Sequence, residues 1–116
     1  MAEQIVEFEL PIKVSSNAIY SGIHWAVRKK HKDIFRWALI TLKTKIKPVE
    51  SCDLEFEFNF KSKPLDCDNV FYSVKLIIDS LRYYGKIPDD SPKYVKSIKV
   101  SSKKSNKNNV ILKICS

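Results

Sequence analysis

The feature that most constrains the fold is a strict alternation of apolar and polar residues from Asp53 to Phe60. Successive side chains of a β-strand point to opposite faces, so this period of two puts all the large apolar side chains on one face. The alternation therefore predicts a strand with one buried side and one acidic side in water. Its apolar positions are Leu54, Phe56, Phe58 and Phe60, and its acidic positions are Asp53, Glu55 and Glu57.

The rest of the N-terminal half predicts one more strand and one helix. Residues 6–12 alternate in the same way, with Glu7 and Glu9 expected on the solvent side. From about 21 to 45, apolar residues recur at spacings of three, four and seven. Such spacing is typical of an amphipathic helix, and the other face of this helix is cationic.

The C-terminal half predicts a second helix and two strands. The helix is expected from about 68 to 84, with Asp68 as its N-cap and Gly85 just past its end. The strands, 94–100 and 109–114, are expected to pair as a hairpin joined by a mobile, lysine-rich segment.

These elements follow one another as β-α-β-α-β-β, an order in which two helices can cover one face of a four-stranded mixed sheet. This is an α+β architecture. No repeat or linker divides the chain, so residues 1–116 are predicted to form a single domain.

The charge of the chain favours a polyanionic partner. Lysine and arginine number 21 against 13 acidic residues, a net charge of +8. A basic surface attracts phosphate backbones, although many basic proteins are only soluble basic proteins. The candidate contacts to DNA phosphates are Arg28, Lys29, Lys30, Lys32, Lys103, Lys104 and Lys107.

Several other classes of protein are disfavoured. The 3 cysteines form no C-x-x-C pair, and residues 1–9 lack the apolar core of a signal peptide, so we expect reduced thiols in a cytoplasmic protein. No run approaches the roughly 18 apolar residues that a membrane span needs. His24 and His31 have no third ligand nearby, which disfavours a zinc site. An EF-hand loop starting at Asp66 would place Phe71 where that loop needs glycine.

Aspartates concentrate between Pro64 and Pro92, where no glutamate occurs. Neighbouring carboxylates repel one another, and a divalent cation removes that repulsion. If the backbone is extended at the first two aspartates, their side chains share a face about 6–7 Å apart, and the last two return toward them after the helix. This pattern favours a Mg²⁺ site, but Asp-x-Asp-Asn and Asp-Asp-Ser-Pro are also common turns and caps. The aspartates are Asp66, Asp68, Asp79, Asp89 and Asp90.

Three linked motifs follow one another in residues 64–100. They are Leu-Asp-Cys-Asp-Asn-Val from Leu65, Lys-Leu-Ile-Ile-Asp-Ser-Leu from Lys75, and Gly-Lys-Ile-Pro-Asp-Asp-Ser-Pro-Lys-Tyr-Val from Gly85. In this combination the chain resembles the RusA family of Holliday-junction resolvases, which shows D-x-D-N, a helical K-x-x-x-D-x-L and D-D after a glycine. A weaker likeness extends to Asn17 and the basic helix after it.

The resemblance implies a RusA-like fold and a homodimeric endodeoxyribonuclease that makes paired cuts in four-way DNA junctions during recombination and repair. It implies Mg²⁺ as cofactor, with Mn²⁺ able to substitute, and a place at the nucleoid in the cytoplasm. It assigns metal binding to Asp66, Asp68 and Asp90. Whether Asp89 is a ligand or only part of the turn stays open.

The helical lysine of the family corresponds to Lys75, but with a different spacing. Lys75 follows Asp68 by seven residues, where the best-known members have four. Either the helix begins later and Lys75 stands near the scissile phosphate as a catalytic residue, or Lys75 only pairs with Asp79 at i,i+4.

Two other functions stay open. A non-catalytic, basic nucleic-acid-binding module of the same fold predicts salt-dependent binding without cutting. A nuclease that acts on flaps or other branched DNA predicts the same chemistry on a wider range of substrates.

Overall fold

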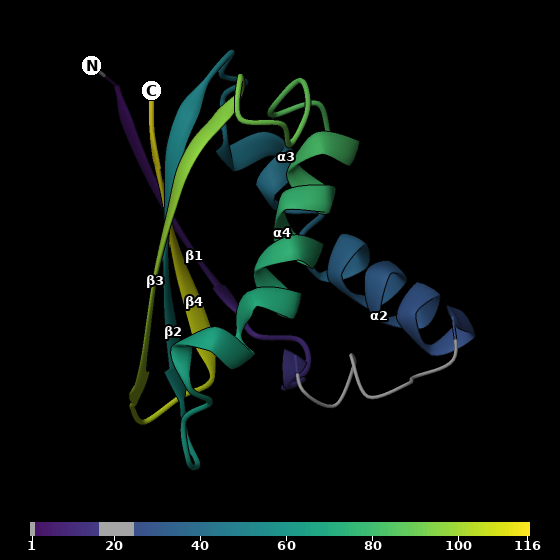
Figure 1. Cartoon of the computed structure of the whole chain (residues 1–116), viewed down its shortest axis with the longest axis vertical. Coiled ribbons are helices and arrows are strands. Elements are labelled where there is room, and N and C mark those ends of the chain that lie inside the picture. The colour runs from purple at the N-terminus through teal and green to yellow at the C-terminus, as the bar shows by residue number, and fades with distance from the viewer. Residues whose placement is uncertain (1, 17–24) are drawn as a thin grey trace.

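The computed structural model describes residues 2–16 and 25–116, and Figure 1 shows one sheet with the helices packed on one side of it. The predicted α+β class with a four-stranded mixed sheet is confirmed. Among these residues no helix is both long enough and apolar enough to cross a bilayer. The elements are β1 (Glu3–Glu9), α2 (Trp25–Ala38), α3 (Leu42–Lys45), β2 (Cys52–Phe60), the 3-10 helix η1 (Cys67–Asn69), α4 (Phe71–Tyr83), β3 (Val95–Lys104) and β4 (Asn109–Cys115).

The first predicted helix is divided, so the described residues form three α-helices where two were expected. α2 ends at Ala38, and a tight turn separates it from α3. In this turn the Leu42 amide donates to the Leu39 carbonyl at 2.9 Å, a spacing of three residues. Both leucines are buried, so the turn keeps their side chains in the core while it redirects the chain. The part of the predicted helix before Trp25 lies outside the described residues.

The sheet order is β1-β4-β2-β3, with β4 antiparallel to both neighbours and β3 parallel to β2. The predicted hairpin between the last two strands is therefore wrong. β4 carries the buried residues Val110, Leu112 and Ile114, whereas β3 is rich in lysine and serine and is exposed along most of its length. The apolar strand takes the centre, and the charged strand takes the edge, where lysine discourages pairing with other chains. β3 continues to Lys104, so only 105–108 of the expected mobile segment connects the two strands.

β2 forms the centre of the core, as its alternation predicts. The Phe58 ring stacks on the rings of Phe56 and Phe60, with centroids 6.3 and 6.4 Å away. α4 adds Ile77 and α2 adds Phe35, both 0% exposed. Burying each such side chain contributes about 1.5–3 kcal/mol. The sheet therefore holds α2 and α4 in a fixed position over its apolar face.

The opposite face of the sheet carries the predicted acidic residues beside lysines. Lys107 lies 2.9 Å from Glu7, and Lys103 lies 3.3 Å from Glu57. The hydrogen bond from Lys107 and its positive charge lower the pKa of Glu7. The expectation that these glutamates, together with Glu9 and Glu55, line the solvent side is confirmed.

The first turn of α4 is capped by Ser16, which lies 56 residues before Tyr72 in the sequence. The Ser16 hydroxyl accepts a hydrogen bond from the Tyr72 amide at 3.0 Å and donates one to the Asn69 carbonyl at 3.1 Å. The prediction of Asp68 as N-cap is wrong: Asp68 lies in η1, and Val70 occupies the N-cap position without a side-chain hydrogen bond. A backbone amide in the first turn, which has no hydrogen-bond partner within the helix, is thus bonded by a residue distant in sequence.

Candidate nucleic-acid interface

α2 and α4 leave a groove between them with a volume of about 320 Å³, called the α2–α4 groove below. Cationic side chains from both helices line it, so its electric field favours an anion. The structure thus brings Lys75 together with three of the cations proposed for phosphate contact. The lining residues are Arg28, Lys29 and Lys32 from α2, and Tyr72, Lys75, Leu76 and Asp79 from α4.

A buried pair, His31 and Tyr72, joins the two helices beside this groove. The Nδ1 atom of His31 lies 3.1 Å from the Tyr72 hydroxyl, and the rings meet edge to face with centroids 5.7 Å apart. Burial lowers the pKa of His31, and the charge of Lys30 lowers it further. His31 is therefore neutral near pH 7, where its contact with Tyr72 fixes the spacing of α2 and α4.

Asp66 and Asp68 lie just before α4 and are exposed. Asp66 has an extended backbone, with φ −62° and ψ 152°, but β2 has already ended at Phe60 and Asp68 lies in η1. The strand that was expected to place both carboxylates on one face does not extend this far. Neither carboxylate is hydrogen-bonded or ion-paired to another side chain in the described part of the chain, so both can take a ligand from solvent.

Asp90 lies at the opposite end of α4, in the turn after Gly85, whose φ of 72° ends the helix as predicted. α4 has 13 residues, a length of about 20 Å. Asp66 and Asp68 precede this helix and Asp90 follows it, so one chain does not bring the three predicted ligands together. Within residues 2–16 and 25–116, no group of three or more His, Cys, Asp or Glu side chains is placed to hold a metal ion.

Arg82 is the counter-charge for the aspartates at this end of α4. Its guanidinium lies 3.3 Å from Asp89, 3.8 Å from Asp90 and 3.9 Å from Asp79. A hydrogen bond from the backbone of Asp90 lowers the pKa of Asp89, and Arg82 lowers it further. An arginine here relieves the carboxylate repulsion that suggested a divalent cation.

α4 begins at Phe71, later than predicted, as the first of the two alternatives for Lys75 requires. The role that this alternative gives Lys75 near a phosphate stays a prediction. The second alternative, an i,i+4 pair with Asp79, is not formed. Asp79 is paired with Arg82, and Lys75 has no ion pair with any described residue. The Lys75 side chain instead lines the α2–α4 groove.

The remaining cations proposed for DNA contact do not share one surface. Lys30 lies on α2 but lines a separate hollow on the outer side of that helix. Lys103 and Lys107 lie on the open face of the sheet in their ion pairs with glutamates. Lys104 follows Lys103 in the strand and therefore points to the opposite face of the sheet.

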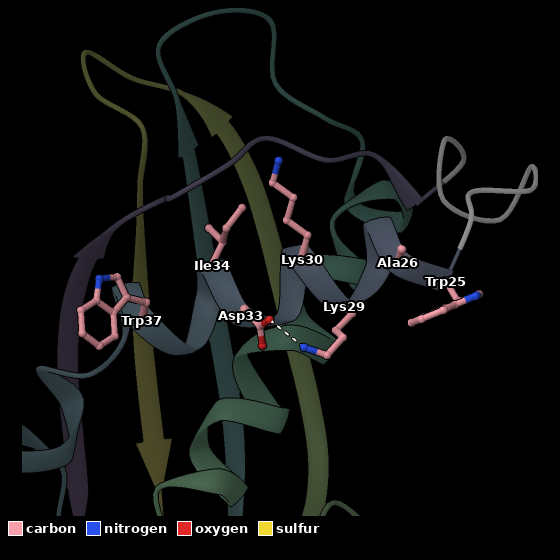
Figure 2. Close-up of a pocket in the computed structure, with 7 residues that line it drawn as sticks. All are labelled: Trp25, Ala26, Lys29, Lys30, Asp33, Ile34 and Trp37. Atoms are coloured by element: carbon pink, nitrogen blue, oxygen red, sulfur yellow. Dashed lines mark hydrogen bonds and ion pairs between the residues drawn. The ribbon is translucent and has the colours of Figure 1, made fainter.

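An exposed aromatic surface on α2 is not among the residues predicted from the sequence. Trp25 and Trp37 are 69% and 76% exposed. Figure 2 shows them toward opposite ends of the helix, with Lys29 and Asp33 between them. These four positions recur every four residues, so they share one side of the helix outside its apolar stripe. That spacing is a signal the sequence holds, because it places Trp37 away from the core side of the helix, where its ring is exposed to solvent.

No protein-family model and no curated protein matches this chain. The likeness to RusA resolvases therefore rests on the motifs in residues 64–100. Asn17, which extends that likeness, and His24 both lie outside the described residues.

Proposed function

We propose that the α2–α4 groove binds the phosphate backbone of nucleic acid. The observation that carries this proposal is the convergence of Arg28, Lys29 and Lys32 with Lys75 around one cavity. The carboxylate of Asp79 in the groove wall is paired with Arg82 and repels phosphate less for that reason. Cations that neutralise phosphates release counterions, so binding should weaken steeply as salt concentration rises.

We propose further that the protein is a Mg²⁺-dependent endodeoxyribonuclease that resolves four-way DNA junctions in the cytoplasm, at the nucleoid. Support comes from the order of the three RusA-like motifs and from the position of the first one. Asp66 and Asp68 immediately precede the first turn of α4, whose Tyr72 lines the groove. A nucleic-acid backbone held in the groove therefore lies near the N-terminal end of α4, next to both carboxylates.

Asp66 and Asp68 fit Mg²⁺ as part of its ligand set. Magnesium is usually held by one or two carboxylates, with water and substrate phosphate oxygens completing the set. Both carboxylates are exposed and lack partners among the described side chains. The ion would offset charge on the phosphate and orient water, while Lys75 adds positive charge beside the phosphate and the groove cations hold the strand in place. Asp90 of the same chain does not fit this set, because α4 separates it from the pair.

A homodimer belongs to this proposal because a four-way junction presents two opposed strands for cutting. A two-fold pair of chains carries two identical grooves related by the same symmetry as the junction. Asp90→Asn tests the role of its carboxylate: if Asp90 only pairs with Arg82, this variant keeps full cutting activity.

The test is incubation of the protein with a labelled four-way junction and with linear duplex, each with and without Mg²⁺. Paired nicks in the junction that require Mg²⁺ are expected. Asp68→Asn should abolish cutting and preserve or tighten junction binding, because it removes a metal ligand and a charge that repels phosphate. Asp53→Asn is the matched control, since Asp53 is exposed on the open face of the sheet beside Ser97. Undiminished cutting by Asp68→Asn would refute the metal assignment.

A non-catalytic nucleic-acid-binding module is the second candidate. It is favoured by the absence, among the described residues, of a group of three metal-ligating side chains. It predicts junction binding with a steep salt dependence and no cutting in either Mg²⁺ or Mn²⁺. Lys75→Ala then lowers affinity alone, whereas in a nuclease it lowers the cutting rate of bound DNA. Equal cutting of flaps and four-way junctions would indicate a broader branched-DNA nuclease.

A further inference from the structure

We propose that the outer side of α2 binds unpaired nucleotides, with a base stacked on Trp37 and the phosphates held by cations on either side of it. This inference deepens the proposed nucleic-acid function and rests on it. It names single-stranded nucleic acid as the ligand of a second surface, next to the α2–α4 groove.

Trp37 stands between two hollows on the surface of the protein. The first, of about 670 Å³, runs along α2 toward Trp25 and is the one drawn in Figure 2. The second, of about 740 Å³, lies between the end of α2 and the end of α4, where Tyr83 is 63% exposed. The indole ring of Trp37 is therefore open to solvent beside a hollow on each side, as a stacking platform for a flat ring requires.

Cations border Trp37 in both hollows. Lys29 and Lys30 line the first hollow, and Arg36 and Lys43 line the second. The Arg36 guanidinium lies over the Tyr83 ring, 4.2 Å from its centroid, which holds a positive charge beside this second aromatic ring.

Asp33 supplies a carboxylate to both hollows. Lys29 lies 3.2 Å from it and offsets its charge. The surface around Trp37 therefore remains cationic and suits phosphates spaced along a strand.

The charge of α2 favours a polyanion over a second copy of this chain as the occupant. Within Trp25–Ala38 five side chains are cationic and Asp33 is acidic, which gives the helix a net charge of +4 with His31 neutral. Two copies packed through this side would bring those like charges together. Unpaired nucleotides offer phosphates to the cations and flat rings to the indole, so they match both features of the surface.

The experiment measures binding of labelled oligothymidine and of an abasic oligonucleotide of equal length, which carries the same phosphates without bases. We expect the wild type to bind oligothymidine more tightly. Trp37→Ala should weaken oligothymidine binding by about 5- to 150-fold, the range for loss of one base–aromatic stack, and leave abasic binding unchanged. Trp37→Phe should retain part of the preference. Ile40→Ala is the matched control, because Ile40 is exposed in the second hollow and offers no aromatic ring.

Equal affinity of the wild type for the two oligonucleotides would overturn the inference, and so would an unchanged preference in Trp37→Ala. A Trp37→Ala variant that dissociates from dimer to monomer in sedimentation, with oligothymidine binding intact, would instead assign the surface to a second copy. The proposed nuclease activity can be refuted independently of this inference. If the protein prefers oligothymidine but never nicks a junction, the nuclease proposal is refuted and this inference stands. If it nicks junctions without preferring oligothymidine, this inference is refuted and the nuclease proposal stands.

Discussion

Replacing Arg82 with methionine tests how the aspartates after α4 are stabilised. Methionine keeps the length and the helix propensity of the side chain and removes the charge that faces Asp79, Asp89 and Asp90. Asp89 and Asp90 are about half exposed, at 46% and 48%, so solvent screens those pairs and they contribute little. The Asp79 side chain is only 12% exposed, and a mostly buried polar group that loses its partner costs about 1–3 kcal/mol. We therefore expect a loss of about 1–2 kcal/mol, mainly through Asp79.

The assay is urea denaturation at pH 7, extrapolated to water, for the wild type and Arg82→Met. The matched control is Lys99→Met, because Lys99 is 80% exposed and lies 4.0 Å from Glu55. That control should leave the unfolding free energy unchanged within error.

The pH dependence gives an independent check on Arg82. The pKa of Asp89 is lower in the folded protein than in the unfolded chain, so its stabilising contribution is present above the unfolded pKa and is lost as pH falls through the folded one. The part of the stability difference between the wild type and Arg82→Met that comes from Asp89 is small, because solvent screens this pair, and it should shrink as pH is lowered from 7 to about 3. Equal stability of the two proteins at pH 7 would refute the assignment of Arg82 as the counter-charge, and a difference that grows as pH falls would refute its contribution to Asp89.

Two further predictions concern the attachment of α4. Ser16→Ala removes the cap on the Tyr72 amide and should lower the unfolding free energy by about 1 kcal/mol, with faster hydrogen exchange at that amide as the specific readout. His31→Gln tests the buried pair with Tyr72: because the pKa of His31 is lowered on folding, the unfolded chain binds more protons below about pH 6.5 and the wild type should lose stability there. The glutamine variant should lose less thermal stability between pH 7.5 and 5, and identical pH profiles for the two proteins would contradict this account.

Periodicity predicted the strands and helices but not the partners of the last two strands. The residues of β2 alternate so strictly that a single reading of their pattern identifies the central strand of the core. Strand order depends on which strand has its apolar face covered by the helices. This is a property of the assembled sheet and not of the local sequence. Val110, Leu112 and Ile114 carry that information for β4, and they outweigh the proximity in sequence that favoured a hairpin with β3.

The three predicted aspartates stay apart in one chain because α4 lies between them. A helix of about 20 Å separates Asp68 from Gly85, and the five residues from Gly85 to Asp90 reach at most about 17 Å even when fully extended. The chain turns after α4 and does not run back along it, so Asp90 stays near Arg82. The convergence of Lys75 with Arg28, Lys29 and Lys32 had no comparable signal, because it depends on how α2 packs against α4.

The distribution of charge favours the helix side of the sheet for the proposed contact with a polyanion. On the open face of the sheet, a phosphate at Lys103 or Lys107 would first have to separate an ion pair of 3.3 or 2.9 Å. On the helix side, Lys32 and Lys75 line the α2–α4 groove without an ion pair to any described residue. Lys29, which is paired with Asp33 at 3.2 Å, lines both this groove and the hollow that leads to Trp37. One helix therefore carries the groove proposed for the duplex backbone and the surface proposed for base stacking next to each other. On these proposals, linear duplex would occupy only the groove, whereas branched DNA with an unpaired strand at its branch point would occupy both surfaces. We therefore expect preference for a branch over linear duplex without contact to any specific base pair.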